Sequence, residues 1–129
     1  MNQSNLDQSR FLHLWGMVLT YASIMGINVK CSGSKSFIRS AEMQAELYKI
    51  GRRGIPDEKT VTICDGINSK SNHQSGQAMD ITIVDDKGEV IYDEAPYRKL
   101  AVFWKSLGGR WGGDFTPGRE PWHYDLMKA

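Results

Sequence analysis

The amino-acid sequence predicts an α+β fold, in which helices flank a small and mainly antiparallel sheet. Apolar residues recur with helical spacing in residues 5–25 and 97–107. Residues 79–84 and 122–126 have instead the alternation and the β-branched or aromatic content of strands. The length of 129 residues fits a single domain over residues 1–129.

The longest apolar pattern predicts a core helix over residues 5–25, ended by Gly26. Its apolar side chains recur every three or four positions and share one helical face: Phe11, Leu14, Trp15, Val18, Leu19, Ala22 and Met25. The stretch is too short to span a bilayer and no basic segment precedes it, so we expect a core helix and no export signal.

A strand and a second helix are predicted next. Residues 27–32 have the composition of a short strand. Ser40 is a candidate N-cap, with Glu42 in the first turn, for a helix over residues 41–50. Residues 61–64 then form another short strand-like run.

Cys31 and Cys64 are the two cysteines of the chain, and each falls in one of these strand-like stretches. They do not form a C-x-x-C pair, and a domain of this size does not require a disulfide. Buried free thiols are therefore the simpler expectation. A disulfide between the two remains open if their strands are neighbours.

The second half predicts a hairpin and a third helix. Residues 79–84 form a strand, residues 85–88 a turn, and residues 89–92 a second strand. A helix over residues 97–107 follows, with Pro96 near its first turn.

The glycine-rich residues 108–118 are predicted to be neither helix nor strand, and a strand over residues 122–126 closes the chain. The 16 Lys and Arg residues nearly balance the 15 Asp and Glu residues, for a net charge of +1. We therefore expect no nucleic-acid partner and no membrane insertion, with a monomer as the default state.

Four residues in two short segments predict a hydrolytic metal site. His73 and Asp80 lie in the first segment, and Glu120 and His123 lie in the second. Two imidazoles and one carboxylate leave a fourth position open on zinc, and Glu120 adds a general base. Taken singly, each of these residues is more simply a surface side chain; together they favour the metal site.

Glu120 and His123 do not belong to a helical H-E-x-x-H motif, because Pro121 disfavours a helical conformation at Glu120. On an extended segment, His123 would face the metal while Glu120 approaches from the preceding corner. Glu120 would then take a proton from water during attack on a carbonyl group. The alternative for Glu120 is a solvated loop carboxylate.

A set of spaced residues resembles the zinc peptidases that cut the stem peptides of peptidoglycan. The matching pattern is Ser71-x-His73-x-x-Gly76-x-Ala78-x-Asp80 with Glu120-x-x-His123. These peptidases are the D-alanyl-D-alanine carboxypeptidase / L-alanyl-D-glutamate endopeptidase family, which shares a fold with the hedgehog signalling domain. Residues 37–44, 47–52 and 107–114 also match, so the resemblance extends over about residues 10–126.

The resemblance implies a hedgehog/DD-peptidase-like fold that binds Zn²⁺ through His73, Asp80 and His123. It also implies that Glu120 is the catalytic base. Arg39 would help to hold the substrate carbonyl or the oxyanion, a role suited to a guanidinium that is always charged. The alternative for Arg39 is a solvated side chain before a helix.

The resemblance implies two further substrate-site residues and one neighbour. Ser71 would orient the loop that carries the first histidine. Trp122 would form part of the pocket wall, or of the core. Gln44 is expected to pack near Arg39 without a catalytic role.

The compact chain resembles phage or prophage endolysins without a separate cell-wall-binding module, made in the host cytoplasm and acting on the cell wall after release. Residues 52–70 are also similar to that branch. Two pairs depart from the family: Gln74-Ser75 stands where an Asn is often seen, and Tyr124-Asp125 replaces Phe-Glu. Both pairs lie beside the expected ligands and bear on the specificity of the pocket.

The first expectation is therefore an L-alanyl-D-glutamate endopeptidase. A D-alanyl-D-alanine carboxypeptidase is the alternative within the same chemistry, and Arg53 or Arg110 would then be candidates for binding a free carboxylate. A non-catalytic zinc-containing binding module is the alternative from another class, and the presence of Glu120 argues against it.

Overall fold

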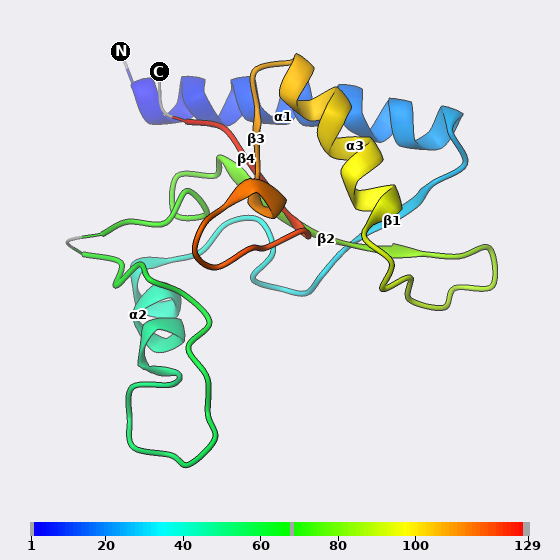
Figure 1. Cartoon of the computed structure of the whole chain (residues 1–129). Coiled ribbons are helices and arrows are strands. Elements are labelled where there is room, and N and C mark those ends of the chain that lie inside the picture. Colours follow the sequence, from blue (N-terminus) through cyan, green and yellow to red (C-terminus); the bar gives the residue numbers. More distant parts are fainter. Residues whose placement is uncertain (1, 68, 128–129) are drawn as a thin grey trace.

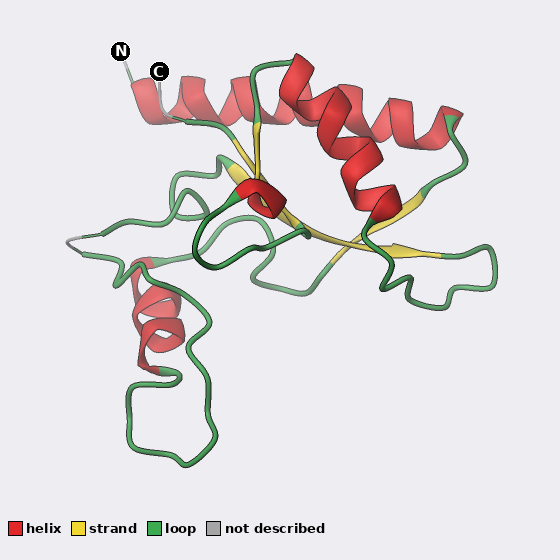
Figure 2. Ribbon diagram, in the orientation of Figure 1, coloured by secondary structure: helices red, strands yellow, loops and turns green. Residues whose placement is uncertain are grey.

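The computed structural model describes residues 2–67 and 69–127 and has the predicted α+β architecture (Figures 1 and 2). In chain order its elements are α1 (Gln3–Ile24), β1 (Asn28–Cys31), α2 (Ala41–Lys49), β2 (Ala78–Val84), α3 (Ala95–Ser106), β3 (Arg110–Trp111), the 3₁₀-helix η1 (Gly112–Asp114) and β4 (His123–Asp125). The predicted N-cap of α2 is confirmed, because the Ser40 side chain accepts a hydrogen bond from the backbone N–H of Met43.

The four strands form one antiparallel sheet in the order β1-β2-β4-β3. The long strand β2 lies inside it and pairs with β1 on one side and β4 on the other. In the β2–β4 register, Asp80 is directly opposite His123 and Ala78 is opposite Asp125. Two segments that are distant in sequence thus meet side by side.

Alternation along the strands sends one set of side chains to the core and the other to the opposite face. Ile81, Ile83 and Tyr124 belong to the core cluster, which also contains residues of α1 and α3. Asp80 and His123 lie at the alternate positions and are directed to the other face. Figure 1 shows α1 and α3 on one side of the sheet and α2 beyond the other side.

Aromatic side chains form the centre of this core. The Trp104 ring is fully buried and makes edge-to-face contacts with Phe11 and Trp15, at centroid distances of 5.6 Å in both cases. Its indole N–H donates to the carbonyl oxygens of Arg110 and Asp125. Trp104 therefore fixes β3 and β4 to α3 as well as filling the core.

The predicted second strand of the hairpin, residues 89–92, is wrong. Only an isolated bridge forms there, between Val84 and Val90. The Tyr97 hydroxyl accepts the backbone N–H of Ile83 at 3.0 Å, so a side chain of α3 takes the place of a strand partner. The predicted turn is present, closed by a hydrogen bond from the Gly88 N–H to the Asp85 carbonyl.

The prediction that residues 108–118 contain no regular structure is also wrong, because β3 and η1 form there. The glycines are needed for close approach: a Cβ atom on Gly109 would overlap the Trp104 ring, and one on Gly112 would overlap the carbonyl oxygen of Glu120. Glycine here permits tight packing between neighbouring segments.

Both cysteines are free, and the expectation that they are buried is wrong. Cys31 is exposed because β1 lies at the edge of the sheet. Cys64 is half-buried in a loop, and residues 61–64 form no strand. The carbonyl of Cys64 accepts instead from the side-chain amide of Gln44 at 2.8 Å. Among the described residues, no helix has the length and apolar content needed to cross a membrane.

A Gly16→Ala substitution is expected to raise the free energy of unfolding by about 1 kcal/mol, because alanine has the higher helix propensity. Gly16 lies on the exposed side of α1, where an added Cβ atom would meet no heavy atom within 4 Å. Urea denaturation followed by circular dichroism would measure the change. Gly109→Ala is the contrasting variant and should be destabilising by about 1–3 kcal/mol through overpacking against Trp104. Equal stabilities of the two variants would contradict this account.

Candidate metal centre

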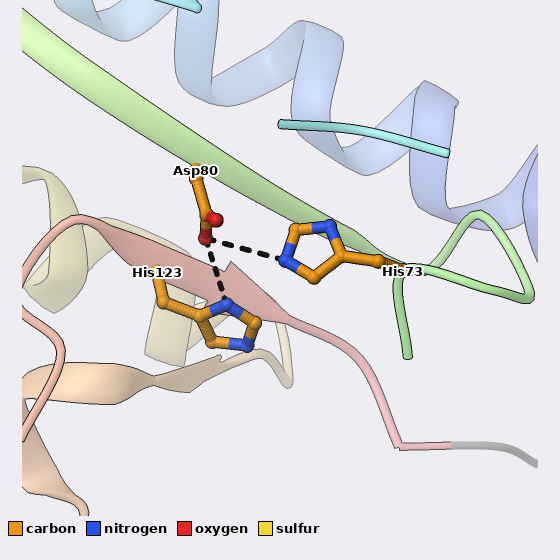
Figure 3. A group of neighbouring side chains, drawn as sticks. All are labelled: His73, Asp80 and His123. Carbon is orange, nitrogen blue, oxygen red and sulfur yellow. Dashed lines mark hydrogen bonds and ion pairs between the residues drawn. The ribbon is translucent and has the colours of Figure 1, made fainter. Parts of the chain in front are cut away.

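Three predicted residues come together on the face of the sheet opposite α1 and α3. Asp80 comes from β2, His123 from β4, and His73 from the loop before β2 (Figure 3). Each offers one ligand atom, and these atoms all lie within 4.8 Å of one another. All three residues are buried. The sequence therefore predicted correctly that these side chains lie together, while their role as zinc ligands stays a prediction.

His73 presents its Nε2 atom to Asp80. Its Nδ1 lies 2.9 Å from the carbonyl oxygen of Phe37, which can only accept, so Nδ1 carries the proton. In the neutral ring Nε2 then has a free lone pair, and it lies 3.3 Å from Asp80 Oδ1. This buried nitrogen has no hydrogen-bond partner within the described residues. Two acceptors facing each other at this distance are satisfied by a cation between them.

His123 is held at both ring nitrogens. Nδ1 lies 2.9 Å from Asp80 Oδ1, and Nε2 lies 2.8 Å from Asp125 Oδ2. Burial alone would lower the pKa of His123, but the hydrogen bonds to Asp125 and Asp80 raise it to about 9. The Nδ1 atom that faces Asp80 is thus the one available to a metal, in exchange for its proton.

The donor set fits zinc. Two imidazole nitrogens and one carboxylate oxygen are zinc's usual protein ligands at a catalytic site, and a fourth position is left for water or substrate. Ligand atoms on a tetrahedral zinc lie about 3.4 Å apart. The separations of 2.9 and 3.3 Å at Asp80 Oδ1 are close to that value.

Arg39 contacts the other oxygen of the same carboxylate. Its Nη2 donates to Asp80 Oδ2 at 3.0 Å, its Nε donates to the Lys35 carbonyl, and its Nη1 donates to Gln44 Oε1. Burial alone would raise the pKa of Asp80, but the hydrogen bond with His123 and the neighbouring His73 ring hold it well below its usual range. Arg39 thus fixes the orientation of Asp80, and its contact with substrate stays a prediction.

Gln44 lies next to Arg39 as predicted, and it is fully buried. Its Nε2 donates to the Thr62 hydroxyl and to the Cys64 carbonyl. The amide therefore links α2 and the loop after it to the Arg39–Asp80 pair.

Glu120 lies beside the three clustered residues. Its backbone is held by hydrogen bonds from its own N–H to the Gly112 carbonyl and from the His123 N–H to its carbonyl. Burial raises the pKa of its carboxyl group, with a further increase from the charge of Asp80. Its side chain makes no hydrogen bond or ion pair within the described part of the chain. A half-buried carboxylate with these properties can accept a proton.

The other two predicted substrate-site residues, Ser71 and Trp122, each have a contact that links them to the cluster. Ser71 Oγ accepts from the backbone N–H of His73 at 3.2 Å, while its role in orienting this loop for a metal stays a prediction. Trp122 is 43% exposed and lines a pocket of about 500 Å³ that extends to Asp80. Trp122 is therefore a pocket wall and not a core residue.

The sequence interpretation missed the residues behind His123. Asp125 accepts from the imidazole and from the Nε and Nη2 atoms of the Arg110 guanidinium, and Asn72 donates to it as well. The available signal was strand alternation, since residues two apart on β4 face the same side.

A Gly112→Ala substitution is expected to weaken zinc binding by about tenfold or more, because the added methyl group would push Glu120 and His123 away from Asp80. Gly33→Ala is the matched control, as a Cβ there meets no heavy atom within 4 Å. Competition with a chromophoric chelator would measure both affinities. Wild-type affinity in Gly112→Ala would show that this packing contact is not needed.

Zinc binding near neutral pH is expected to release about one proton from His123, because a group with a pKa of about 9 is protonated there. The apparent affinity should therefore fall as the pH is lowered, and the release should diminish as the pH rises past that pKa. Calorimetric titration in two buffers of different ionisation enthalpy counts the protons. No release at neutral pH would contradict the assignment.

Comparison with known proteins finds a family model that matches the part of the chain carrying this site. Residues 65–126, which include His73, Asp80, Glu120 and His123, match the family model described as D-alanyl-D-alanine carboxypeptidase. No curated protein sequence matches the chain.

Two solved structures share the fold. The Serratia marcescens L-Ala D-Glu endopeptidase ChiX aligns with 98% of this chain and 87% of its own, at 19% identity and a TM-score of 0.63. The LD-carboxypeptidase LdcB aligns with 99% of this chain at 17% identity and a TM-score of 0.55, and the match spans 65% of its own length. Residues 65–126 thus resemble the D-alanyl-D-alanine carboxypeptidase family, and the two solved structures show that the fold is shared.

Proposed function

We propose that the protein is a zinc-dependent peptidoglycan hydrolase that cleaves the L-alanyl-D-glutamate bond of the stem peptide. The observation that carries this proposal is the convergence of His73, Asp80 and His123 beside the carboxylate of Glu120. The match of residues 65–126 to a carboxypeptidase family model supports peptidase chemistry, and the solved structures of similar fold are described as an L-Ala D-Glu endopeptidase and an LD-carboxypeptidase.

Zinc held by these three residues would polarise the scissile carbonyl and lower the pKa of water. Glu120 accepts the proton of the attacking water, since no described residue hydrogen-bonds to its carboxylate and its pKa is raised by burial. The same carboxyl group then donates that proton to the leaving amine.

Arg39 supplies positive charge beside the reacting carbonyl. Its Nη2 is engaged by Asp80 Oδ2, so the guanidinium is held rigidly next to the ligand cluster. Preorganised charge of this kind stabilises the negative charge that develops on a carbonyl oxygen during hydrolysis. Trp122 forms one wall of the adjoining pocket, in which part of the substrate would lie.

The charge pairing of the candidate arginines favours the endopeptidase over the carboxypeptidase. A carboxypeptidase needs a group that binds the free terminal carboxylate of its substrate. Arg53 is already paired with Glu58 through Nε and Nη2, and Arg110 is paired with Asp125 in the same way. To bind a substrate carboxylate through the same Nε and Nη2 atoms, either guanidinium would have to break its bidentate pair.

The proposed biological role is that of a phage or prophage endolysin, acting on the cell wall after release from the host cytoplasm. This role rests on the sequence resemblance of residues 52–70. We further propose that the protein acts as a monomer.

Digestion of purified peptidoglycan, followed by mass analysis of the fragments, tests the proposed bond. New L-alanine C-termini and D-glutamate N-termini, lost with a chelator and restored by zinc, are the expected products. Release of free D-alanine would identify a carboxypeptidase. Intact peptidoglycan after incubation with the zinc-loaded protein would favour the binding module.

In the same assay, Glu120→Ala is expected to keep one bound zinc and the native fold but to lose hydrolysis by a factor of about 10² to 10⁴. Glu89→Ala is the matched control, because Glu89 is an exposed carboxylate in the turn after β2. Metal content and circular dichroism would be measured on both variants. Full activity in Glu120→Ala would remove this residue from the role of general base.

A further inference from the structure

We propose that Asp125 is a positioning residue for zinc, and that its one carboxylate holds both histidine-bearing segments in their binding arrangement. Asp125 lies on β4 two residues after His123 and is only 2% exposed. The inference rests on the zinc site proposed above and concerns a residue outside the ligand cluster.

Both oxygens of the Asp125 carboxylate accept hydrogen bonds. Its Oδ1 accepts from Arg110 Nε at 2.8 Å. Its Oδ2 accepts from Arg110 Nη2 at 2.8 Å, from His123 Nε2 at 2.8 Å and from Asn72 Nδ2 at 3.2 Å. A carboxylate bound in this way has one possible orientation.

The contact with His123 determines which ring nitrogen faces the metal position. A carboxylate only accepts, so His123 Nε2 must carry a proton. Nδ1, which is directed at Asp80, is then the nitrogen that can offer a lone pair once a metal displaces its proton. A histidine ligand whose outer nitrogen is bound to a carboxylate is held in one tautomer and one ring orientation.

The contact with Asn72 extends this control to the other histidine. Asn72 directly precedes His73 in the loop before β2. The backbone is fixed nearby, since the Leu126 N–H donates to the Gln77 carbonyl and Ala78 is paired with Asp125 in the sheet. Asp125 therefore connects the two segments that must bring their imidazoles to one point.

Arg110 makes it possible to bury the charge of Asp125. The two residues are cross-strand neighbours in the β3–β4 register, and the guanidinium forms a fork on the carboxylate. Burying a carboxylate without such a partner would cost folding free energy. A guanidinium that pairs with the carboxylate and donates hydrogen bonds to it offsets that cost. The Trp104 indole also donates to the Asp125 carbonyl, which ties this position to the core.

Asp125 is not a fourth ligand of the same ion. It contacts Nε2 of His123, while Asp80 contacts Nδ1, and these two nitrogens point to different sides of the ring. Its carboxylate therefore lies behind the imidazole. A positioning role accounts for all of its contacts.

Zinc affinity of Asp125→Asn, compared with wild type by competition with a chromophoric chelator, tests the proposal. Asparagine keeps the size of the side chain but places an amide N–H₂ group against donors, so the affinity should fall by about 10- to 100-fold. Asp114→Asn is the matched control: it removes the same charge from an exposed carboxylate that pairs with Lys105 on the surface. This control should bind zinc like wild type.

The visible spectrum of the cobalt-substituted protein is a second readout, because it reports ligand geometry and not stability. Asp125→Asn is expected to shift the absorption bands of bound cobalt, and Asp114→Asn is not. Asn72→Ala should weaken zinc binding by a smaller factor and should add little in the Asp125→Asn background, since its partner is already lost.

The outcomes separate this proposal from the proposed function. If wild type binds no zinc, both proposals are overturned. Zinc affinity and a cobalt spectrum like wild type in Asp125→Asn overturn the positioning role and leave the zinc peptidase intact. If Asp125→Asn does not fold, Asn72→Ala decides, because it leaves the Arg110–Asp125 pair in place. A wild-type affinity and spectrum in that variant would then overturn the proposal.

Discussion

The pairing of β2 with β4 is the constraint on which the site depends. The register sets Asp80 opposite His123, and a shift by one residue would turn one of them into the core. That register is secured from the core side, where Tyr124 packs against Trp15 and donates its hydroxyl proton to the Tyr97 carbonyl. Apolar packing on one face of the sheet thus determines the positions of polar groups on the other.

On the face of the sheet that carries the site, the carboxylates of Asp80 and Asp125 are both buried and paired with charged or titratable side chains. Asp80 is engaged by two histidines and Arg39, and Asp125 is engaged by His123 and Arg110. Glu120 differs because burial raises its pKa and because, among the described residues, its carboxylate forms no ion pair. The electrostatic environment therefore distinguishes a carboxylate suited to bind a cation from one suited to carry a proton.

Sequence patterns predicted the parts of the molecule that depend on local periodicity or on close spacing. The helices around Trp15 and Trp104 follow from the spacing of apolar residues, and the meeting of His73 with Asp80 follows from a short, glycine-containing segment. The strand at residues 89–92 was predicted wrongly because a distant hydroxyl, that of Tyr97, occupies the hydrogen-bonding position. The Arg110–Asp125 pair was missed for a similar reason, since it joins two strands whose register no local pattern reveals.

The buried amide of Gln44 connects the loop after α2 to the candidate metal centre, although that loop is distant from Asp80 and His123 in sequence. This side chain joins the Thr62 hydroxyl and the Cys64 carbonyl to the guanidinium that holds Asp80. We expect a rearrangement of that loop to rotate the Asp80 carboxylate, because Gln44 and Arg39 connect the two. Substitutions in the exposed part of the loop can therefore change the protein surface without disturbing the site. Substitutions at residues 62–64 would disturb the hydrogen bonds that support Arg39 and Asp80.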